Sequence, residues 1–127
     1  MTTPTVSSIA ARALDALVAL LADAGIDASR DAGAFYPQPV GVLVGLPTLT
    51  SRGHGSRTFT VPVFVVSGDP FNSEAAVNRA LALADDVALA TKTDNYRPSA
   101  YRGGVNSEPL PCFELSVVVT TPEEVSP

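Results

Sequence analysis

The sequence contains a single cysteine, Cys112, and this scarcity excludes two kinds of site. One thiol cannot form a disulfide within the chain, and it cannot supply the clustered thiolates of a cysteine-based metal site. A lone cysteine also fits a protein that works in a reducing cytoplasm. Because Cys112 opens an expected strand and has no cationic neighbour in the sequence, we interpret it as a packed thiol rather than a nucleophile.

Histidine is equally scarce, since His54 is the only one in the chain. Histidine is the usual general base near neutral pH, and general-base catalysis needs a base held in a fixed position. His54 lies between Gly53 and Gly55 at an expected turn, which would hold it poorly. Adjacent carboxylates at Asp85-Asp86 point about 100° apart on a helix, so they do not face one ion. We therefore expect no catalytic residue, no metal site and no enzymatic activity.

Basic residues are also too few for a nucleic-acid-binding protein. Eight Lys and Arg stand against thirteen Asp and Glu, which gives a net charge of -5 and a pI near 4.6. Binding to phosphates depends on clustered Lys and Arg, so we do not expect nucleic acid as the main partner. Gly103-Gly104 is not followed by a helical pattern and therefore predicts no phosphate-binding loop. No cofactor is expected.

Long apolar runs are absent as well. No run approaches the roughly 20 residues of a membrane-spanning helix. The first residues, Met1–Thr5, have neither the basic nor the apolar region of a signal peptide. We expect a soluble protein that binds no membrane and stays where it is made.

What the sequence does contain is typical of one folded domain. Hydrophobic residues make up 46% and charged residues 17% of the chain, a balance found in globular proteins. The 127 residues suffice for one core but not comfortably for two. We expect a single domain over residues 1–121, followed by a flexible acidic tail over residues 122–127.

Two segments have the apolar spacing of amphipathic helices, Val6–Ala24 and Glu74–Thr91. Gly25 follows the first where a C′ glycine would end it. Their expected N-caps are Ser7 or Ser8 and Asn72 or Ser73. The expected buried face of the first helix consists of Ile9, Ala13, Ala16, Leu17, Leu20, Leu21 and Ala24. That of the second consists of Val77, Ala80, Leu81, Ala84, Val87 and Ala88, with Leu83 beside it.

The segment Gly41–Ser67 predicts a long β-hairpin, because two apolar runs flank the polar tip Ser51–Arg57. Its second arm is apolar on both faces, and one of these faces can be covered by the two helices. The other face needs cover that so short a chain has little left to supply, which hints at assembly. Pro62 interrupts the hydrogen-bond ladder of this arm, so we expect it on a sheet edge or at a bulge.

The remaining strands are shorter or later in the chain. Cys112–Thr121 alternates apolar and polar residues and predicts a final strand. Short strands are expected near Ala28–Arg30 and near Ala100–Arg102, within an otherwise irregular segment, Lys92–Pro111. The order helix, strand, strand, helix, strand predicts an α+β domain with a small antiparallel or mixed sheet and both helices on one face.

Two groups of residues are candidates for contact with a partner. One is the hairpin tip, with Arg52, His54 and Arg57; the other is the later segment, with Tyr96, Arg97, Tyr101 and Arg102. Tyrosine and arginine are enriched in protein interfaces and their hot spots. The alternative for both groups is a solvated surface without a special role, and base stacking is disfavoured by the acidity of the chain.

This layout resembles the tail terminator (minor tail protein U-like) family of long-tailed bacteriophages. In that family a first helix leads to a proline-preceded apolar strand, a long hairpin, a second helix, a loop and a final strand. The corresponding segments here are Val6–Ala24, Pro37–Leu46, Gly41–Ser67, Glu74–Thr91, the Tyr96–Gly104 loop and Cys112–Thr121. The resemblance covers nearly the whole chain and consists of layout rather than a diagnostic motif.

The resemblance implies a structural virion protein at the junction of tail and neck, assembled in the cytoplasm of a bacterial host. Six copies would form a ring that caps the tail tube, stops polymerisation of the major tail protein and presents a surface to the head–tail connector. DNA would only pass through the lumen, and no catalytic residue carries over. A head–tail connector or stopper is the nearest alternative, and a small ligand-binding or enzymatic α+β domain is an alternative of another class.

Overall fold

The computed structural model describes residues 8–31, 35, 37, 39–53, 55–69, 73–103 and 106–122, with the backbone alone at residues 52, 53, 103 and 106–108. Within these residues the chain forms the helices α1 (Ile9–Asp23) and α2 (Glu74–Thr91). Its strands are β1 (Ala28–Ser29), β2 (Val40–Val44), β3 (Thr48–Gly53), β4 (Ser56–Ser67), β5 (Arg97–Gly103) and β6 (Asn106–Pro122). They form one mixed sheet, and the expected α+β fold is confirmed.

The helix ends follow from local chemistry. Ser8 caps α1 and Ser73 caps α2, each hydroxyl oxygen accepting a hydrogen bond from a backbone N–H three residues on. After α1 the chain turns at Gly25, whose φ of +80° suits glycine. The N–H of Ile26 donates to the carbonyl of Leu21 at 2.8 Å, which completes a Schellman motif. The bounds of α2 are the expected ones, while the expected start of α1 at Val6 lies outside the described residues.

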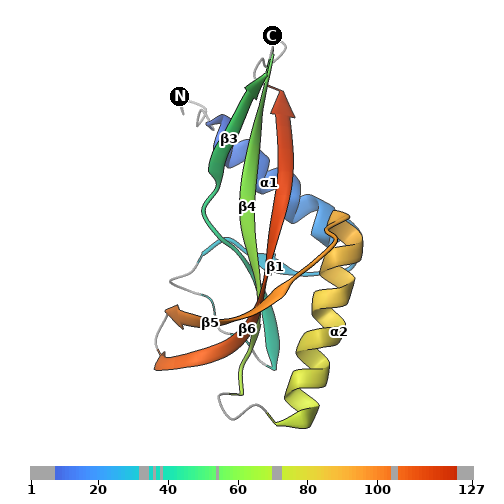
Figure 1. Cartoon of the computed structure of the whole chain (residues 1–127), viewed down its shortest axis with the longest axis vertical. Coiled ribbons are helices and arrows are strands. Elements are labelled where there is room, and N and C mark those ends of the chain that lie inside the picture. The colour runs from blue at the N-terminus through green and yellow to red at the C-terminus, as the bar shows by residue number, and fades with distance from the viewer. Residues whose placement is uncertain are drawn as a thin grey trace, which may run out of the picture.

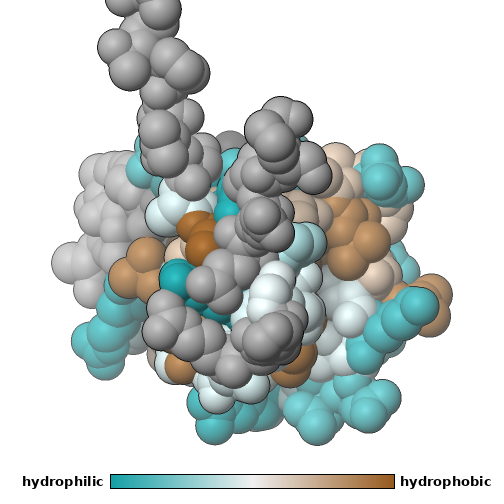
Figure 2. All heavy atoms as spheres, turned by 90° about the horizontal axis from the view of Figure 1, so that it is seen from above, coloured by the Kyte–Doolittle hydropathy of each residue, from teal (hydrophilic) through white to brown (hydrophobic). Residues whose placement is uncertain are grey.

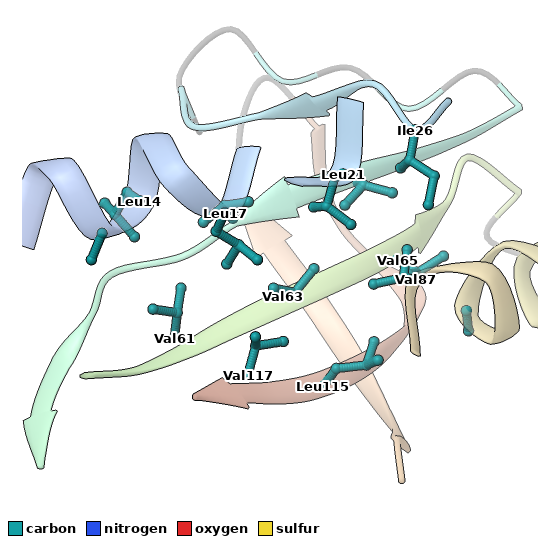
Figure 3. Close-up of a cluster of buried hydrophobic side chains, with 14 of the residues drawn as sticks. Leu14, Leu17, Leu21, Ile26, Val61, Val63, Val65, Val87, Leu115 and Val117 are labelled. Carbon is teal, nitrogen blue, oxygen red and sulfur yellow. The ribbon is translucent and has the colours of Figure 1, made fainter. Parts of the chain in front are cut away.

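Both helices lie on the same face of the sheet and bury one core (Figure 1). Leu14, Leu17 and Leu21 of α1 point toward the valines of β4 in the core (Figure 3). Val87 of α2 and Leu115 of β6 complete this layer. Burial of such side chains is the main favourable contribution to folding. It contributes about 1.5–3 kcal/mol to the free energy of unfolding for each fully buried valine or leucine.

The buried face of α1 differs from the expected one. Leu14 is buried, whereas Ala16, Ala24 and Leu20 are exposed, the last by 45%. Leucine and alanine occur on several sides of this helix. Apolar spacing alone therefore did not define which side is buried, and the predicted face is rotated about the helix axis from the observed one. In α2 the buried residues Ala76, Ala80, Ala84 and Val87 likewise include one that the sequence stripe omitted, Ala76.

The expected hairpin is confirmed, but its first arm is broken. β2 and β3 both pair with β4, and Gly45–Pro47 forms an irregularity between them. The carbonyl of Pro62 accepts a hydrogen bond of 2.7 Å from the N–H of Gly45. Since the N–H and C=O of one strand residue face the same neighbour, the missing N–H of Pro62 faces this irregularity. Pro62 therefore lies in a central strand, opposite the break between β2 and β3, rather than on a sheet edge, and the β4–β6 register continues through it without a bulge.

The segment expected to be irregular is largely β-structure. β5 spans Arg97–Gly103, and β6 begins at Asn106 rather than Cys112. The reason is that β6 pairs with β5 over its first half and with β4 over its second half, so its early prolines lie where only one neighbour requires hydrogen bonds. Pro122 ends β6, while the rest of the expected tail, residues 123–127, lies outside the described residues.

The face of the sheet away from the helices is covered at one end only. A second apolar cluster contains Val66, Leu110 and Cys112, with Phe35, Phe64 and Tyr101 packed against it. The expectation that the chain cannot cover this face is therefore wrong near Val66, where Phe35 from the connector packs against the cluster. Toward the other end Val118 is 66% exposed.

Candidate functional site

The hairpin tip brings two of its candidate residues together. Arg52 of β3 and Arg57 of β4 are direct register partners, and Arg57 also lies opposite Thr121 of β6. Arg57 is half-buried. Of Arg52 only the backbone is described, and His54 lies outside the described residues. The structure therefore joins the two arginines across one strand pair at the end of the sheet.

Tyr96 anchors the segment between α2 and β5 to the core. Its hydroxyl donates a hydrogen bond of 2.6 Å to Oδ1 of Asp85 on α2. Its ring packs edge-on against Phe113, with the ring centroids 5.5 Å apart. The hydrogen bond to Asp85 raises the pKa of the Tyr96 hydroxyl, because the carboxylate stabilises the protonated phenol. These contacts give Tyr96 a structural role within the chain.

Tyr101 also faces inward. Its ring meets that of Phe35 edge-on at 5.6 Å and belongs to the cluster around Val66 and Cys112. Its hydroxyl oxygen is buried and has no hydrogen-bond partner among the described residues. Replacement of Tyr101 would therefore disturb the fold as well as any contact with a partner.

The two arginines of the same segment face solvent. Arg97 is 75% exposed, and its Nη2 donates to Oε2 of Glu114 across the β5–β6 pair at 3.3 Å. Glu114 is only 19% exposed, so the pair is open to solvent on the arginine side alone. Arg102, farther along β5, is exposed as well. Of the four candidates in this segment, Arg97 and Arg102 are thus the ones accessible to a partner.

A cavity of about 390 Å³ lies between α2 and the β5–β6 pair, and the sequence patterns did not predict it. Its walls are mostly apolar and include Ala80, Pro98 and Phe113. The buried Cys112 lines it, with Ser99 as its register partner on β5. Burial raises the pKa of the Cys112 thiol, the hydrogen bond from Ser99 lowers it, and the nearby carboxylate of Glu114 raises it. The net shift is upward, which disfavours the nucleophilic thiolate.

We expect Cys112 to react slowly with a charged disulfide reagent in the native protein. Modification at pH 8 should be slower than in denaturant by a factor on the order of a hundred, because the thiol is buried and protonated. Since its pKa is raised, the native rate should still be increasing with pH above 9, where the rate of an ordinary thiol levels off. Absorbance of the released thiol measures both rates, and equal rates in the two states would contradict this placement.

The described residues hold no group of three or more His, Cys, Asp or Glu side chains that could bind a metal ion. Among the same residues, neither helix has the length and apolar content needed to cross a bilayer.

One end of the sheet is a three-stranded ribbon. It is formed by β3, the Ser56–Thr60 part of β4 and the Leu115–Pro122 part of β6. It extends past α2 toward the end where the chain terminates (Figure 1). Leu49 is 48% and Val118 66% exposed on it, and Leu46 at its base is 84% exposed. Figure 2, which looks down on this end, shows apolar atoms in separate spots among hydrophilic ones rather than in one continuous patch.

The ribbon has two different free edges. β3 pairs with β4 on one side only, and β5 pairs with β6 only as far as Glu114. Within the described residues, no strand therefore flanks Leu115–Pro122 on the side away from β4. Neither protein family models nor curated protein sequences give a match to this chain.

Proposed function

We propose that this chain is a structural assembly protein, a phage tail terminator whose copies form a hexameric ring on the end of the tail tube. The ring would stop polymerisation of the major tail protein and offer a surface to the head–tail connector. The order of the two helices, the hairpin and the final strand supports this proposal, since the family resemblance implies it, but the Tyr96–Gly104 loop of that layout is largely strand β5 here. So does the α+β architecture, with both helices on one face of the sheet.

The observation that carries the proposal is the ribbon with two unlike edges. A ring requires a heterologous contact, in which one surface of a subunit meets a different surface of the next. The edges of β3 and β6 lie on opposite sides of the same ribbon, so each copy has one of each. Exposed Leu49 and Val118 on this ribbon add apolar surface that a neighbouring copy could bury.

The charge of the chain is consistent with a ring through which DNA passes. With a net charge of -5, a ring of such chains would present a mainly negative field, and DNA would not adhere to it. We expect the lumen to be poor in Lys and Arg.

The proposal is tested by electron microscopy of the purified protein mixed with tail tubes of the same virus. We expect rings at tube ends and tubes of uniform length. Replacing both Arg97 and Arg102 with alanine should reduce the fraction of capped ends by about tenfold, because exposed arginines are common interface anchors. Arg97 is 75% exposed but its partner Glu114 only 19%, so circular dichroism and the unfolding midpoint of the variant must show that loss of the pair leaves the fold intact.

The matched control is Arg79→Ala, which removes an exposed arginine from α2. Capping by this variant should equal that of the native chain. Uncapped tubes with the native protein would refute the terminator proposal, and normal capping by the double variant would remove Arg97 and Arg102 from the contact.

Two other functions give different results in the same preparations. A connector or stopper would leave tails of normal length and would be needed to keep DNA in filled heads. A ligand-binding domain would remain a monomer in solution with an apolar molecule in the 390 Å³ cavity beside Cys112. The mass of the protein in solution, alone and with tail tubes, separates these classes.

A further inference from the structure

The free edge of β6 carries backbone groups that point away from the sheet. Pro62 and Ser116 are register partners, and the backbone of Pro62 faces β2 rather than β6. Pro62 and Ser116 are therefore a non-hydrogen-bonded pair. Along an antiparallel strand pair, hydrogen-bonded and non-hydrogen-bonded pairs alternate. It follows that Ser116, Val118 and Thr120 direct their N–H and C=O groups outward, while the residues between them bond to β4.

This edge lacks the features that normally prevent strands from pairing. Proteins protect exposed edges with charged residues, prolines, bulges or a covering loop. The seven residues Leu115–Thr121 include no charge and no proline, and four of them are valine or leucine. The chain passes from α2 to β5 nearby, but an open space of about 590 Å³ separates Thr91–Asn95 from Ser116 and Val118. Ser116 and Val118 are therefore open to solvent on this side.

Of the other free edges in the chain, that of β3 is the best complement. β1 has only two residues. The outer edge of β5 contains Pro98, whose missing N–H faces outward because Pro98 pairs with Phe113, a residue that bonds to β4. Leu49 and Arg52 of β3 direct their backbone groups away from β4, on either side of a bulge between Leu49 and Ser51 that interrupts the regular alternation. β3 spans six residues, close to the length of the β6 edge.

Charge also distinguishes the two sides of the ribbon. On the β3 side, residues 40–53 contain one arginine, Arg52, and no Asp or Glu, while Arg57 lies on the central strand β4. On the other side, the exposed C-terminal end of α2 and the residues after it contain Asp85, Asp86 and Asp94 against Lys92 alone. A basic β3 side would thus approach an acidic β6 side, which favours contact between copies in this orientation over contact between two like sides.

We propose that the Leu115–Thr121 edge of one copy pairs with β3 of a second copy, so that the sheet continues from subunit to subunit. The inference deepens the proposed function and rests on it for the closure of the contacts into a ring. The contact itself requires only this chain. Backbone hydrogen bonds across the edge supply affinity, and the opposite charges of the two sides set the polarity.

A proline at Val118 tests the contact. The N–H of Val118 faces away from β4. Val118→Pro therefore removes one donor from the free edge and none from the β4–β6 ladder. We expect the dissociation constant for self-association, measured by sedimentation velocity over a concentration series, to rise about tenfold or more. The matched control is Ala100→Pro, which removes an outward N–H from the exposed edge of β5 and should leave self-association unchanged.

Hydrogen exchange on the native protein gives a second readout if the proline variant fails to fold. Amides of Ser116, Val118 and Thr120 should become protected as protein concentration rises, while the amide of Ala100 should not. Exchange that is independent of concentration, or equal weakening by both proline variants, would overturn the contact even if the protein still caps tails. Concentration-dependent protection without any binding to tail tubes would instead uphold the contact and refute the terminator function.

Discussion

Replacing Leu17 with alanine is expected to lower the free energy of unfolding by about 3 kcal/mol. Leu17 is 2% exposed and lies between α1 and the valines of β4 (Figure 3). Its truncation removes apolar contacts and leaves a cavity that the surrounding sheet cannot collapse to fill. Chemical denaturation followed by circular dichroism measures the loss.

The matched control is Leu20→Ala, the same change three residues later on the same helix. Leu20 is 45% exposed, so its loss should lower the free energy of unfolding by less than about 1 kcal/mol. Both variants keep the helix propensity nearly equal, since leucine and alanine are both good helix formers. Similar losses at the two positions would show that α1 does not present the Leu17 face to the core.

The helices illustrate what local sequence signals can predict. The bounds of α2 follow from Ser73 at its N-cap and from apolar residues at 3–4 spacing. The orientation of each helix was harder to predict, because Leu14 and Leu20 are chemically identical and only the position of the sheet decides which one is buried. Caps are local signals, whereas the choice of buried face depends on tertiary packing.

The β5–β6 pair shows where local signals mislead. Pro98 and Pro111 belong to the segment that was expected to be irregular, and proline cannot donate to a ladder. In the structure they lie opposite Phe113 and Ala100, in pairs whose backbone groups face away from each other. A proline at such a position removes no hydrogen bond from the pair. Whether it is tolerated depends on the register with a distant strand, which composition does not reveal.

The sequence predicted the solvent exposure of only some of the candidate interface residues, because exposure also depends on distant contacts. Residue types indicated an interface at the Tyr96–Arg102 segment, and Arg97 and Arg102 do face solvent there. The two tyrosines pack against Phe113 and Phe35 instead. The free edge of β6 had no sequence motif of its own. It follows only from the register at which β5 ends, opposite Glu114.

The outer face of the sheet has a covered part near Val66 and an open part toward Ser56. Near Val66 both faces are covered, by the helices on one side and by the Phe35 cluster on the other. Toward Ser56 the outer face is open, and its threonines bond to one another, as Thr58 and Thr120 do at 3.1 Å. The second apolar cluster thus covers only the part of the outer face near Val66. That division requires Phe35 to act as a cover for the outer face.

Replacing Gly41 with alanine is expected to lower the free energy of unfolding by about 2 kcal/mol, because Phe35 occupies the space of the new methyl group. A Cβ at Gly41 would lie 2.9 Å from Cε1 and Cζ of the Phe35 ring and 3.3 Å from Cα of Pro37. The ring cannot withdraw without losing its edge-on contact with Tyr101. Without this crowding, Gly→Ala within a strand should stabilise by reducing the entropy of the unfolded chain.

The test is therefore a double-mutant cycle between Gly41→Ala and Phe35→Ala. Phe35→Ala alone should also destabilise, since it uncovers Val66 and Tyr101. In the Phe35→Ala background the clash with the ring is removed and only the 3.3 Å approach to Cα of Pro37 remains, so the cost of Gly41→Ala should fall well below its value in the native background. A coupling free energy of at least about 1 kcal/mol is expected from denaturation of the four proteins. Strictly additive losses would mean that Phe35 does not cover Gly41, and the outer face near Val66 would then need a cover from another molecule.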